Sequence, residues 1–283
     1  MSARILSGTA VAKTVKERVA SEVEELKAAG IDVGLATLLV GDDPASHVYV
    51  GYKHKDADAV GMRSIDVQLP ASASQEEVLA AVDDLNARDD VTGMIVQLPL
   101  PNGLDGEAAV ERVLPTKDAD GLHPFNLGRM ILGRPGPLPA TPAGVMTILD
   151  HYGIKASGKT AVVIGRSFLV GKPMALLLGA KGVDATVIQA HSRTPDLASV
   201  SATADILITA IGRPGMVDAS FVKPGAVVID VGTTRTADGL RGDVIFDEVS
   251  EIAGAITPVP GGVGPMTRAS LLLNTVGLAR AGI

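Results

Sequence analysis

The second half of the chain alternates between short apolar runs and segments of helical or turn-forming sequence. Short apolar runs bounded by turn signals are typical of buried strands. Consecutive parallel strands need a crossover connection, so this alternation predicts a parallel sheet with helices on both faces, in the doubly wound manner. The expected strands lie at 160–164, 185–188, 206–209, 226–230 and 255–257.

The first half of the chain follows a similar alternation, which predicts a second α/β domain. Apolar residues recur at helical spacing from Val11 to Leu26, and Gly30 can end that helix. The other expected elements are strands at 33–40 and 93–98, a helix at 46–61 capped by Ser46, and a helix opened by a capping box of Ser74 and Glu77.

Two stretches rich in proline and glycine divide the sequence, GRPGPLPATPAG at 133–144 and ITPVPGGVGP at 256–265. Such stretches cannot continue a helix or a central strand, and we interpret them as the hinges of an inserted middle domain. The predicted first domain comprises residues 1–140 plus 264–283, and the second comprises residues 141–263. The tail after Pro265 is expected to form a helix that returns to the first domain.

Composition excludes several classes of protein. The 283 residues include no cysteine, which rules out disulfides, thiolate metal sites and thiol catalysis. A net charge of −7 argues against general binding to nucleic acid or to anionic membranes. His47, His54, His123 and His151 lack metal-ligand spacing, so no metal site is expected. No apolar run reaches the length of a membrane span and no signal peptide is visible, so the expected location is the cytoplasm.

A glycine-containing loop follows the strand expected at 160–164. Gly165, Arg166 and Ser167 lead through Gly171 into a helix expected at 174–181. In a dinucleotide-binding fold, phosphates bind the free N–H groups of a helix N-terminus at this position. Ser167 replaces the usual second glycine, so the loop alone could be an ordinary turn. The strands that follow it favour a Rossmann-like domain with a bound dinucleotide.

The residues at the end of the next strand indicate which dinucleotide the domain binds. Enzymes that prefer NAD usually place a carboxylate there to bind the ribose hydroxyls. This chain has His191, Ser192 and Arg193 instead, and Arg193 and Arg166 would attract the 2′-phosphate of NADP. The alternative is that Ser192 and Thr194 cap the next helix and that Arg193 is only solvated. We favour NADP.

Polar residues in the first half suggest a substrate site. Tyr49 and Lys53 are four residues apart and would share one helix face. Gln97 stands near the end of a strand, just before a proline, where it can point into a cleft. Asp118 and Asp120 could bind a ligand or could form a turn. From the residues alone, these positions remain a plausible site and no more.

The whole set of motifs resembles the bifunctional methylenetetrahydrofolate dehydrogenase/methenyltetrahydrofolate cyclohydrolase family. Any one of the motifs could arise by chance, but together they span nearly the whole chain in the expected order. They are PAS (44–46) with Tyr49 and Lys53, VQLPLP (96–101), KDADG (117–121), VIGRS (163–167), VGKP (170–173), HSRT (191–194), KPGAVVIDVG (223–232) and TPVPGGVGPMT (257–267).

The resemblance implies an activity in one-carbon metabolism and purine biosynthesis. NADP would oxidise 5,10-methylenetetrahydrofolate to the 5,10-methenyl cation, and water would open that cation to 10-formyltetrahydrofolate. The family is homodimeric, and its partners are tetrahydrofolate derivatives. This chain is too short to carry an additional large formate-ligating domain.

The resemblance also implies residue roles. Lys53 would carry the proton transfers of ring opening, Gln97 would hydrogen-bond it, Tyr49 would stack on the folate and Asp120 would bind the pterin. The cofactor would contact Gly165, Arg166, Ser167, Ser192, Arg193 and Thr233, and the folate would lie close to the backbone of Pro260, Gly261 and Gly262.

Two other functions fit parts of this pattern. Another two-domain NADP-dependent dehydrogenase, acting for example on a small hydroxy acid, would not explain Tyr49, Lys53, Gln97 and Asp120 together. A non-catalytic protein that binds NADP or folate would not require the intact Lys53.

Overall fold

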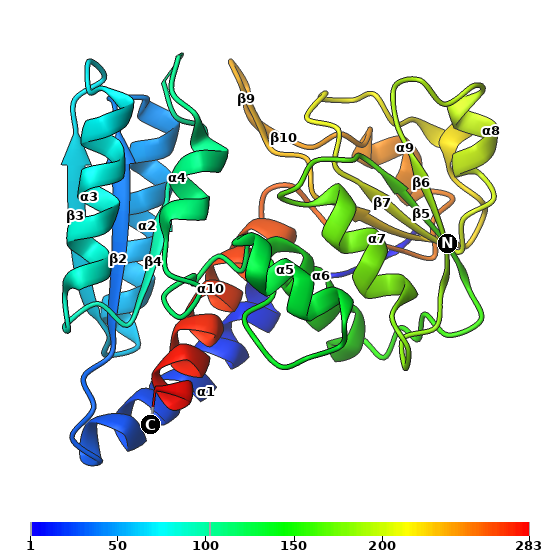
Figure 1. Cartoon of the computed structure of the whole chain (residues 1–283). Coiled ribbons are helices and arrows are strands. Elements are labelled where there is room, and N and C mark those ends of the chain that lie inside the picture. The colour runs from blue at the N-terminus through cyan, green and yellow to red at the C-terminus, as the bar shows by residue number, and fades with distance from the viewer. Residues whose placement is uncertain (1, 102, 283) are drawn as a thin grey trace. The chain divides into compact units, whose positions relative to one another are not determined.

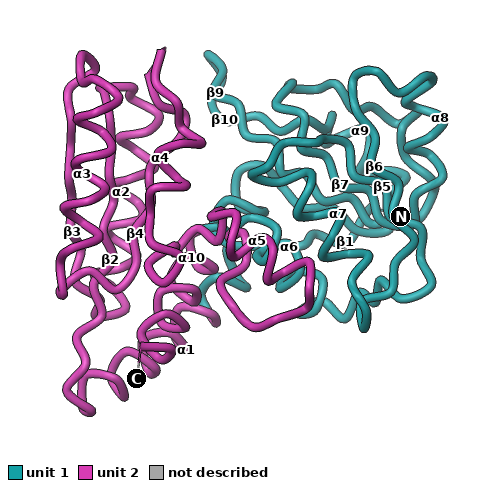
Figure 2. The backbone as a smooth tube through the Cα atoms, in the orientation of Figure 1, with its two compact units in different colours: residues 1–13, 141–267 teal, residues 14–140, 268–283 magenta. Residues whose placement is uncertain are grey.

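The computed structural model describes residues 2–101 and 103–282, which form two compact units (Figure 2). Unit 1 comprises residues 1–13 and 141–267, and unit 2 comprises residues 14–140 and 268–283. From the sequence, residues 1–13 are expected in the other domain. They belong to unit 1 because strand β1 (Arg4–Ile5) pairs with strand β11 (Ala255–Ile256).

Unit 1 is built on a six-stranded parallel sheet (Figure 1). The strand order β1-β11-β8-β7-β5-β6 reverses direction at β5, which lies between β6 and β7, so the sheet is doubly wound as predicted. The expected strands are all present, each within a residue or two of its predicted bounds. They are β5 (Thr160–Ile164), β6 (Thr186–Ala190), β7 (Ile206–Thr209), β8 (Val227–Asp230) and β11.

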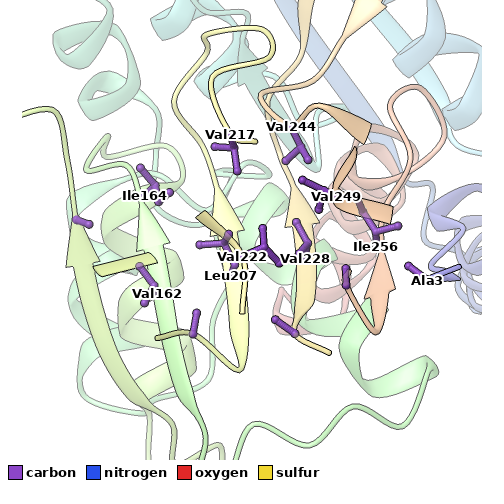
Figure 3. Close-up of a cluster of buried hydrophobic side chains, with 14 residues drawn as sticks. Ala3, Val162, Ile164, Leu207, Val217, Val222, Val228, Val244, Val249 and Ile256 are labelled. Atoms are coloured by element: carbon purple, nitrogen blue, oxygen red, sulfur yellow. The ribbon is translucent and has the colours of Figure 1, made fainter. Parts of the chain in front are cut away.

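Aliphatic side chains from these strands form the core of unit 1. Val162, Leu207 and Val228 come from three neighbouring strands and are fully buried. Figure 3 shows them in one cluster with Ile256 and with Ala3 from the N-terminal segment. Burial of these side chains stabilises the sheet, and contact with Ala3 explains further why the first residues belong to unit 1.

Short helices connect the strands of unit 1. Helix α7 begins three residues earlier than predicted, because Gly171 already lies in its first turn. A short antiparallel hairpin, which the sequence analysis did not predict, follows β8. The elements are α6 (Ala140–His151, of which Ala140 belongs to unit 2), α7 (Gly171–Gly179), α8 (Leu197–Ser201), the 3₁₀ helix Ala219–Phe221, β9 (Thr234–Thr236), β10 (Gly239–Arg241) and α9 (Phe246–Ser250).

Unit 2 contains a three-stranded parallel sheet in the order β3-β2-β4. The central strand β2 is buried at every position, as its continuous apolar sequence predicts. Strand β3 was not predicted, because its edge position leaves it with a mixed polar sequence. The strands are β2 (Gly34–Val40), β3 (Arg63–Leu69) and β4 (Gly93–Val96).

Helices complete unit 2. The last part of α10 belongs to this unit, so the C-terminal helix returns to the first domain as expected. No helix in residues 2–101 and 103–282 combines the length and apolar character needed to cross a membrane. The helices are α1 (Gly8–Ala28, from Thr14 on), α2 (Pro44–Ala59), α3 (Gln75–Ala87), α4 (Gly106–Arg112), α5 (Pro124–Ile131) and α10 (Val263–Ala281, from Arg268 on).

One of the two predicted helix caps is confirmed and the other is wrong. Ser74 and Glu77 form the reciprocal capping box at the start of α3. Helix α2 starts before Ser46, because the Asp43 side chain accepts the Ser46 N–H at 2.8 Å and Pro44 fits the first helical position.

The two proline- and glycine-rich stretches differ from the predicted hinges. Helix α6 begins at Ala140, and Pro142 lies in its first turn, where a missing N–H costs no intrahelical hydrogen bond. Helix α10 begins at Val263 and likewise accommodates Pro265. The three boundaries between the units all fall within helices, after Lys13, after Ala140 and after Thr267.

Candidate functional site

The amine of Lys53 lies at the centre of a polar cluster in unit 2. Lys53 is only 5% exposed. Its Nζ donates a hydrogen bond of 3.1 Å to Oε1 of Gln97, and it lies 5.0 Å from the centroid of the Tyr49 ring. Lys53 is thus in contact with both of the residues that the sequence pattern groups with it, Gln97 and Tyr49.

Local structure explains why these side chains meet. Tyr49 and Lys53 are one turn apart on α2. Gln97 directly follows β4, and its backbone N–H is held by the carbonyl of Leu38 on β2 at 2.9 Å. The side-chain amide of Gln97 donates to the carbonyl of Leu98 at 2.8 Å. That bond uses the amide nitrogen and leaves Oε1 directed at the lysine.

Burial lowers the pKa of Lys53 below that of an ordinary lysine, because the charged amine loses its hydration. The carboxylate of Asp120 opposes this effect, and the positive charge of Arg268 adds to it. A lowered pKa makes the neutral, proton-accepting form of the amine more accessible than in an ordinary lysine, which favours a role in general acid–base catalysis.

Asp120 is held by a loop that Asp118 organises. The buried Asp118 carboxylate accepts hydrogen bonds from the N–H groups of Leu122 and His123 and from the amide of Asn126. Asp118 therefore has the turn-forming role, and Asp120 is left to act on Lys53. Burial raises the pKa of Asp120, and the lysine charge partly offsets that rise.

Arg268 is a further residue of this site, and no sequence pattern predicts it. Its Nε donates to the Asp56 carboxylate at 2.7 Å, and its guanidinium lies 5.2 Å from the centroid of the Tyr52 ring. Arg268 directly follows the TPVPGGVGPMT motif in sequence, but nothing in its spacing connects it with α2. Only the fold of unit 2 brings it near Lys53.

In unit 1, the strand ends form a common edge. Ile164 of β5 is paired with Ala190 of β6 and with Thr209 of β7, and Thr209 is paired with Asp230 of β8. All these strands are parallel, so the segments after them emerge at the same carboxyl edge of the sheet. In doubly wound sheets this edge binds ligands, at the point where the strand order reverses.

Two glycines shape the loop between β5 and α7. Gly165 has a φ of 145°, and a Cβ there would lie 2.6 Å from the carbonyl oxygen of Ala210. A Cβ on Gly171 would lie 2.6 Å from the backbone nitrogen of Arg166. Both positions therefore require glycine, and this close packing is the reason that dinucleotide-binding loops use it.

The predicted contacts Ser167 and Arg166 differ in their surroundings. The Ser167 hydroxyl accepts the N–H groups of Val170 and Gly171 at 3.2 and 3.4 Å, so it stabilises the start of α7. The Arg166 side chain is exposed. The hydroxyl of Ser167 thus holds the loop backbone in place, and the exposed cation of Arg166 lies beside the N-terminus of α7.

Ser192 and Arg193 lie in the turn after β6 and are exposed. Within this turn the Thr194 hydroxyl accepts the His191 N–H at 2.9 Å. The alternative that Ser192 and Thr194 cap the next helix is wrong, because the cap of α8 is Asp196. Arg193 places a cation where a carboxylate would select NAD.

Thr233 follows β8 and is exposed at the same edge. The backbone next to Thr233 is held by the buried carboxylate of Asp230, which accepts the N–H groups of Gly232, Asp243 and Val244. Burial raises the pKa of Asp230 to about 6. The Asp243 carboxylate in turn accepts three N–H groups of the segment after β7, residues 211–213.

Pro260, Gly261 and Gly262 follow β11 and pack closely on the start of α1. Gly261 has a φ of 100°, and its carbonyl accepts the N–H of Thr9 at 3.0 Å. A Cβ on Gly8 would collide with the carbonyl of Gly262. These glycines are therefore needed for packing within unit 1, whatever ligand they contact.

No group of three or more potential metal-binding side chains occurs in residues 2–101 and 103–282. The chain combines an α/β unit that has a dinucleotide-type loop with an α/β unit that has a buried lysine, whose pKa burial lowers. These features define the class of two-domain, nicotinamide-dependent enzymes.

Comparison with known proteins narrows this class. The model of the tetrahydrofolate dehydrogenase/cyclohydrolase catalytic domain matches residues 6–120, and the model of the NAD(P)-binding domain of the same family matches residues 139–282. The bifunctional protein FolD of Oleidesulfovibrio alaskensis is 54% identical over 275 residues, with 96% of each chain covered. The chain belongs to the tetrahydrofolate dehydrogenase/cyclohydrolase family.

Solved structures agree with this assignment. FolD from Campylobacter jejuni matches with a TM-score of 0.95 and 43% identity, over 99% of both chains. The FolD structure from Trypanosoma brucei, complexed with NADP cofactor and inhibitor, matches with a TM-score of 0.95 and 40% identity, over 100% of this chain and 99% of that one. Shikimate 5-dehydrogenase from Thermus thermophilus, at 16% identity and a TM-score of 0.55, shares the fold alone.

Proposed function

We propose that this protein oxidises 5,10-methylenetetrahydrofolate to 5,10-methenyltetrahydrofolate with NADP and then hydrolyses the product to 10-formyltetrahydrofolate. The observation that carries the proposal is the buried amine of Lys53, hydrogen-bonded to Gln97 and placed against Tyr49. Membership of the family supports both steps. Unit 2 is the proposed folate-binding and catalytic domain, and unit 1 is the proposed NADP-binding domain.

In this proposal Lys53 moves protons during ring opening. Water must lose a proton as it adds to the methenyl carbon, and a ring nitrogen must gain one as its bond to that carbon breaks. A lysine whose pKa is lowered by burial can serve both transfers. Gln97 holds the amine in place, Tyr49 stacks on the folate, and Asp120 accepts hydrogen bonds from the donor edge of the pterin.

NADP is the proposed cofactor, and the residues of unit 1 fit it. Gly165 and Gly171 keep the backbone close at the start of α7, where phosphates bind free N–H groups. Arg166, Ser192, Arg193 and Thr233 are exposed at the carboxyl edge and are the proposed polar contacts, with Ser167 bracing the loop. When bound, NADP supplies the nicotinamide that accepts the hydride. The loop Pro260–Gly262 is proposed to approach the folate through its backbone.

On the family resemblance we further propose that the protein acts as a homodimer in the cytoplasm and binds tetrahydrofolate derivatives, with neither nucleic acid nor membrane as a partner. Its acidic character, with a net charge of −7, supports the last two points.

A two-step assay tests the proposed function. Purified protein receives 5,10-methylenetetrahydrofolate with NADP, and separately with NAD, while reduced nicotinamide and the methenyl product are followed. We expect reduction with NADP and protein-dependent loss of the methenyl species. Reduction without that loss would leave a monofunctional dehydrogenase, and reduction with neither cofactor would favour another dehydrogenase or a non-catalytic binding protein.

Cofactor preference is expected to depend on Arg193. The Arg193→Ser change removes a cation from the turn after β6, so the KM for NADP should rise about tenfold, the usual worth of a charge-assisted hydrogen bond. The KM for NAD should stay constant, because NAD lacks the 2′-phosphate. The Lys181→Ser variant is the control, since that exposed cation lies before β6, at the opposite end of the strand. An equal effect on both cofactors would show that Arg193 does not read the phosphate.

A further inference from the structure

One face of helix α2 carries more than the Tyr49–Lys53 pair. Tyr52 lies three residues after Tyr49, and Asp56 lies three residues after Lys53. At this spacing the four side chains occupy adjoining parts of the helix surface. Asp56 is mostly buried, with 14% of its side chain exposed. Asp56 lies three residues from Lys53 on α2, and a free carboxylate at this spacing would stabilise the charged amine.

Two cations hold Asp56. Nζ of Lys16, from α1, lies 2.9 Å from Oδ1, and Nε of Arg268, from α10, lies 2.7 Å from Oδ2. The three groups together carry one net positive charge. The Arg268 side chain is 18% exposed, which weakens screening by solvent.

The guanidinium of Arg268 is held on a second side by Tyr52, whose ring centroid lies 5.2 Å away. The two residues that hold the guanidinium are both close to Lys53 on α2. Tyr52 is one residue from Lys53, and Asp56 is three residues from it. Because both partners are on α2, the charge keeps its place relative to the lysine. A guanidinium is a permanently charged group, so the positive charge is constant.

We propose that Arg268, clamped by Asp56 and Tyr52, is a positioning residue that holds a permanent positive charge beside Lys53 and so keeps the lysine amine available as a proton acceptor. The charged groups that act on Lys53, among residues 2–101 and 103–282, are Arg268 and Asp120, and they act in opposite directions. Gln97 and Tyr49 also contact its amine. The catalytic consequence of this role rests on the proposed ring-opening function of Lys53.

Replacement of Arg268 should shift the pKa of Lys53 in one defined direction. Without the guanidinium, the charged amine of Lys53 is less unfavourable, so its pKa rises and a smaller fraction is neutral at a given pH. For the loss of one charge in a partly buried site, we expect that fraction to fall about three- to tenfold at pH values below the pKa. Lys16 still pairs with Asp56 in the variant, so no carboxylate is left unpaired.

The test compares Arg268→Gln with Arg268→Lys and Arg280→Gln. Arg280 lies on the same helix and is paired with Glu22 at 3.1 Å and with Glu25 at 3.5 Å, so its loss removes an arginine ion pair of α10 that does not involve α2. Nζ of Lys53 is titrated by NMR in protein labelled with ¹⁵N-lysine, the signal being assigned by its absence in a Lys53→Met sample. Ring opening of 5,10-methenyltetrahydrofolate is measured over the same pH range, and thermal melting checks the fold.

We expect Arg268→Gln to lower the neutral fraction of Lys53 and to slow ring opening three- to tenfold at low pH, with recovery as pH rises. Arg268→Lys and Arg280→Gln should both resemble the parent protein. An unchanged titration of Lys53 in Arg268→Gln would overturn the proposal, as would a loss of rate that is equal at every pH. Should Arg268→Gln fail to fold, Arg268→Met, which keeps an unbranched apolar stem against Tyr52, takes its place.

The two arms separate this inference from the proposed function. If the parent protein opens no methenyl ring, the proposed function fails, and the NMR titration still decides whether Arg268 controls Lys53. If the parent is active and the titration of Lys53 does not move in Arg268→Gln, the function stands and the role of Arg268 fails.

Discussion

The Lys53→Met variant is expected to lose ring opening of 5,10-methenyltetrahydrofolate almost completely, by about 10²- to 10⁴-fold, the usual contribution of a general acid–base group. Methionine is close to lysine in length and cannot exchange a proton. Hydride transfer depends on positioning more than on proton transfer, so folate binding should persist and the methenyl product should accumulate when the variant is given 5,10-methylenetetrahydrofolate and NADP.

Loss of the amine should not unfold the protein. Lys53 is buried with one hydrogen bond to Gln97, and a buried charged amine is costly to maintain. Methionine removes that cost and fills similar space. We expect the melting temperature of the variant to equal or exceed that of the parent, which separates a chemical defect from a folding defect.

Lys55→Met provides the matched control. Lys55 lies on the same helix two residues away, but its side chain is exposed and points away from the cluster around Gln97. Its replacement should leave ring opening unchanged. Parent-like ring opening by Lys53→Met, with methenyltetrahydrofolate supplied directly, would remove the proton-transfer role from Lys53.

The sequence predicted the sheet of unit 1 well because its inner strands β5, β7 and β8 are buried along almost their whole length. Val162, Leu207 and Val228 belong to uninterrupted apolar runs, which few structures other than buried strands explain. Strand β3 gave no such signal, since an edge strand exposes half of its residues to solvent. β1 was also missed, because two residues that pair with β11, some 250 positions away, form no local pattern.

Proline was the main source of error in the boundaries. The stretches at 133–144 and 256–265 were interpreted as hinges on composition, yet α6 contains Pro142 and α10 contains Pro265. In the first turn of a helix a proline breaks no intrahelical bond, so proline density marks where a helix begins as readily as where it ends.

The candidate site shows a similar limit. Tyr49, Lys53 and Gln97 could be grouped because a four-residue spacing and a strand end predict where side chains point. Arg268 could not be found this way, because its partner Asp56 is 212 residues away and an arginine on a helix is usually solvated. Its role depends on which face of α10 meets α2, and this is decided by packing.

The second large effect is expected at Gly171. In the Gly171→Ala variant the new Cβ would lie 2.6 Å from the backbone nitrogen of Arg166, and real Cβ atoms do not approach backbone so closely. The start of α7 must then move away from the loop after β5. The free N–H groups proposed to hold the cofactor phosphates would no longer converge, so NADPH affinity should fall by at least about 100-fold, equivalent to the loss of one or two charge-assisted hydrogen bonds.

Gly179→Ala, at the other end of α7, isolates this effect. A Cβ there would lie 3.6 Å from a methyl group of Val187, an ordinary van der Waals contact. Because alanine is the better helix former, this variant should be as stable as the parent or more stable by up to about 1 kcal/mol. Both variants are titrated with NADPH by its fluorescence, which is free of tryptophan interference in this chain, and melted thermally. Unchanged NADPH binding by Gly171→Ala would mean that the cofactor phosphates do not depend on the close packing of Gly171 against Arg166, and would move the proposed phosphate site away from the start of α7.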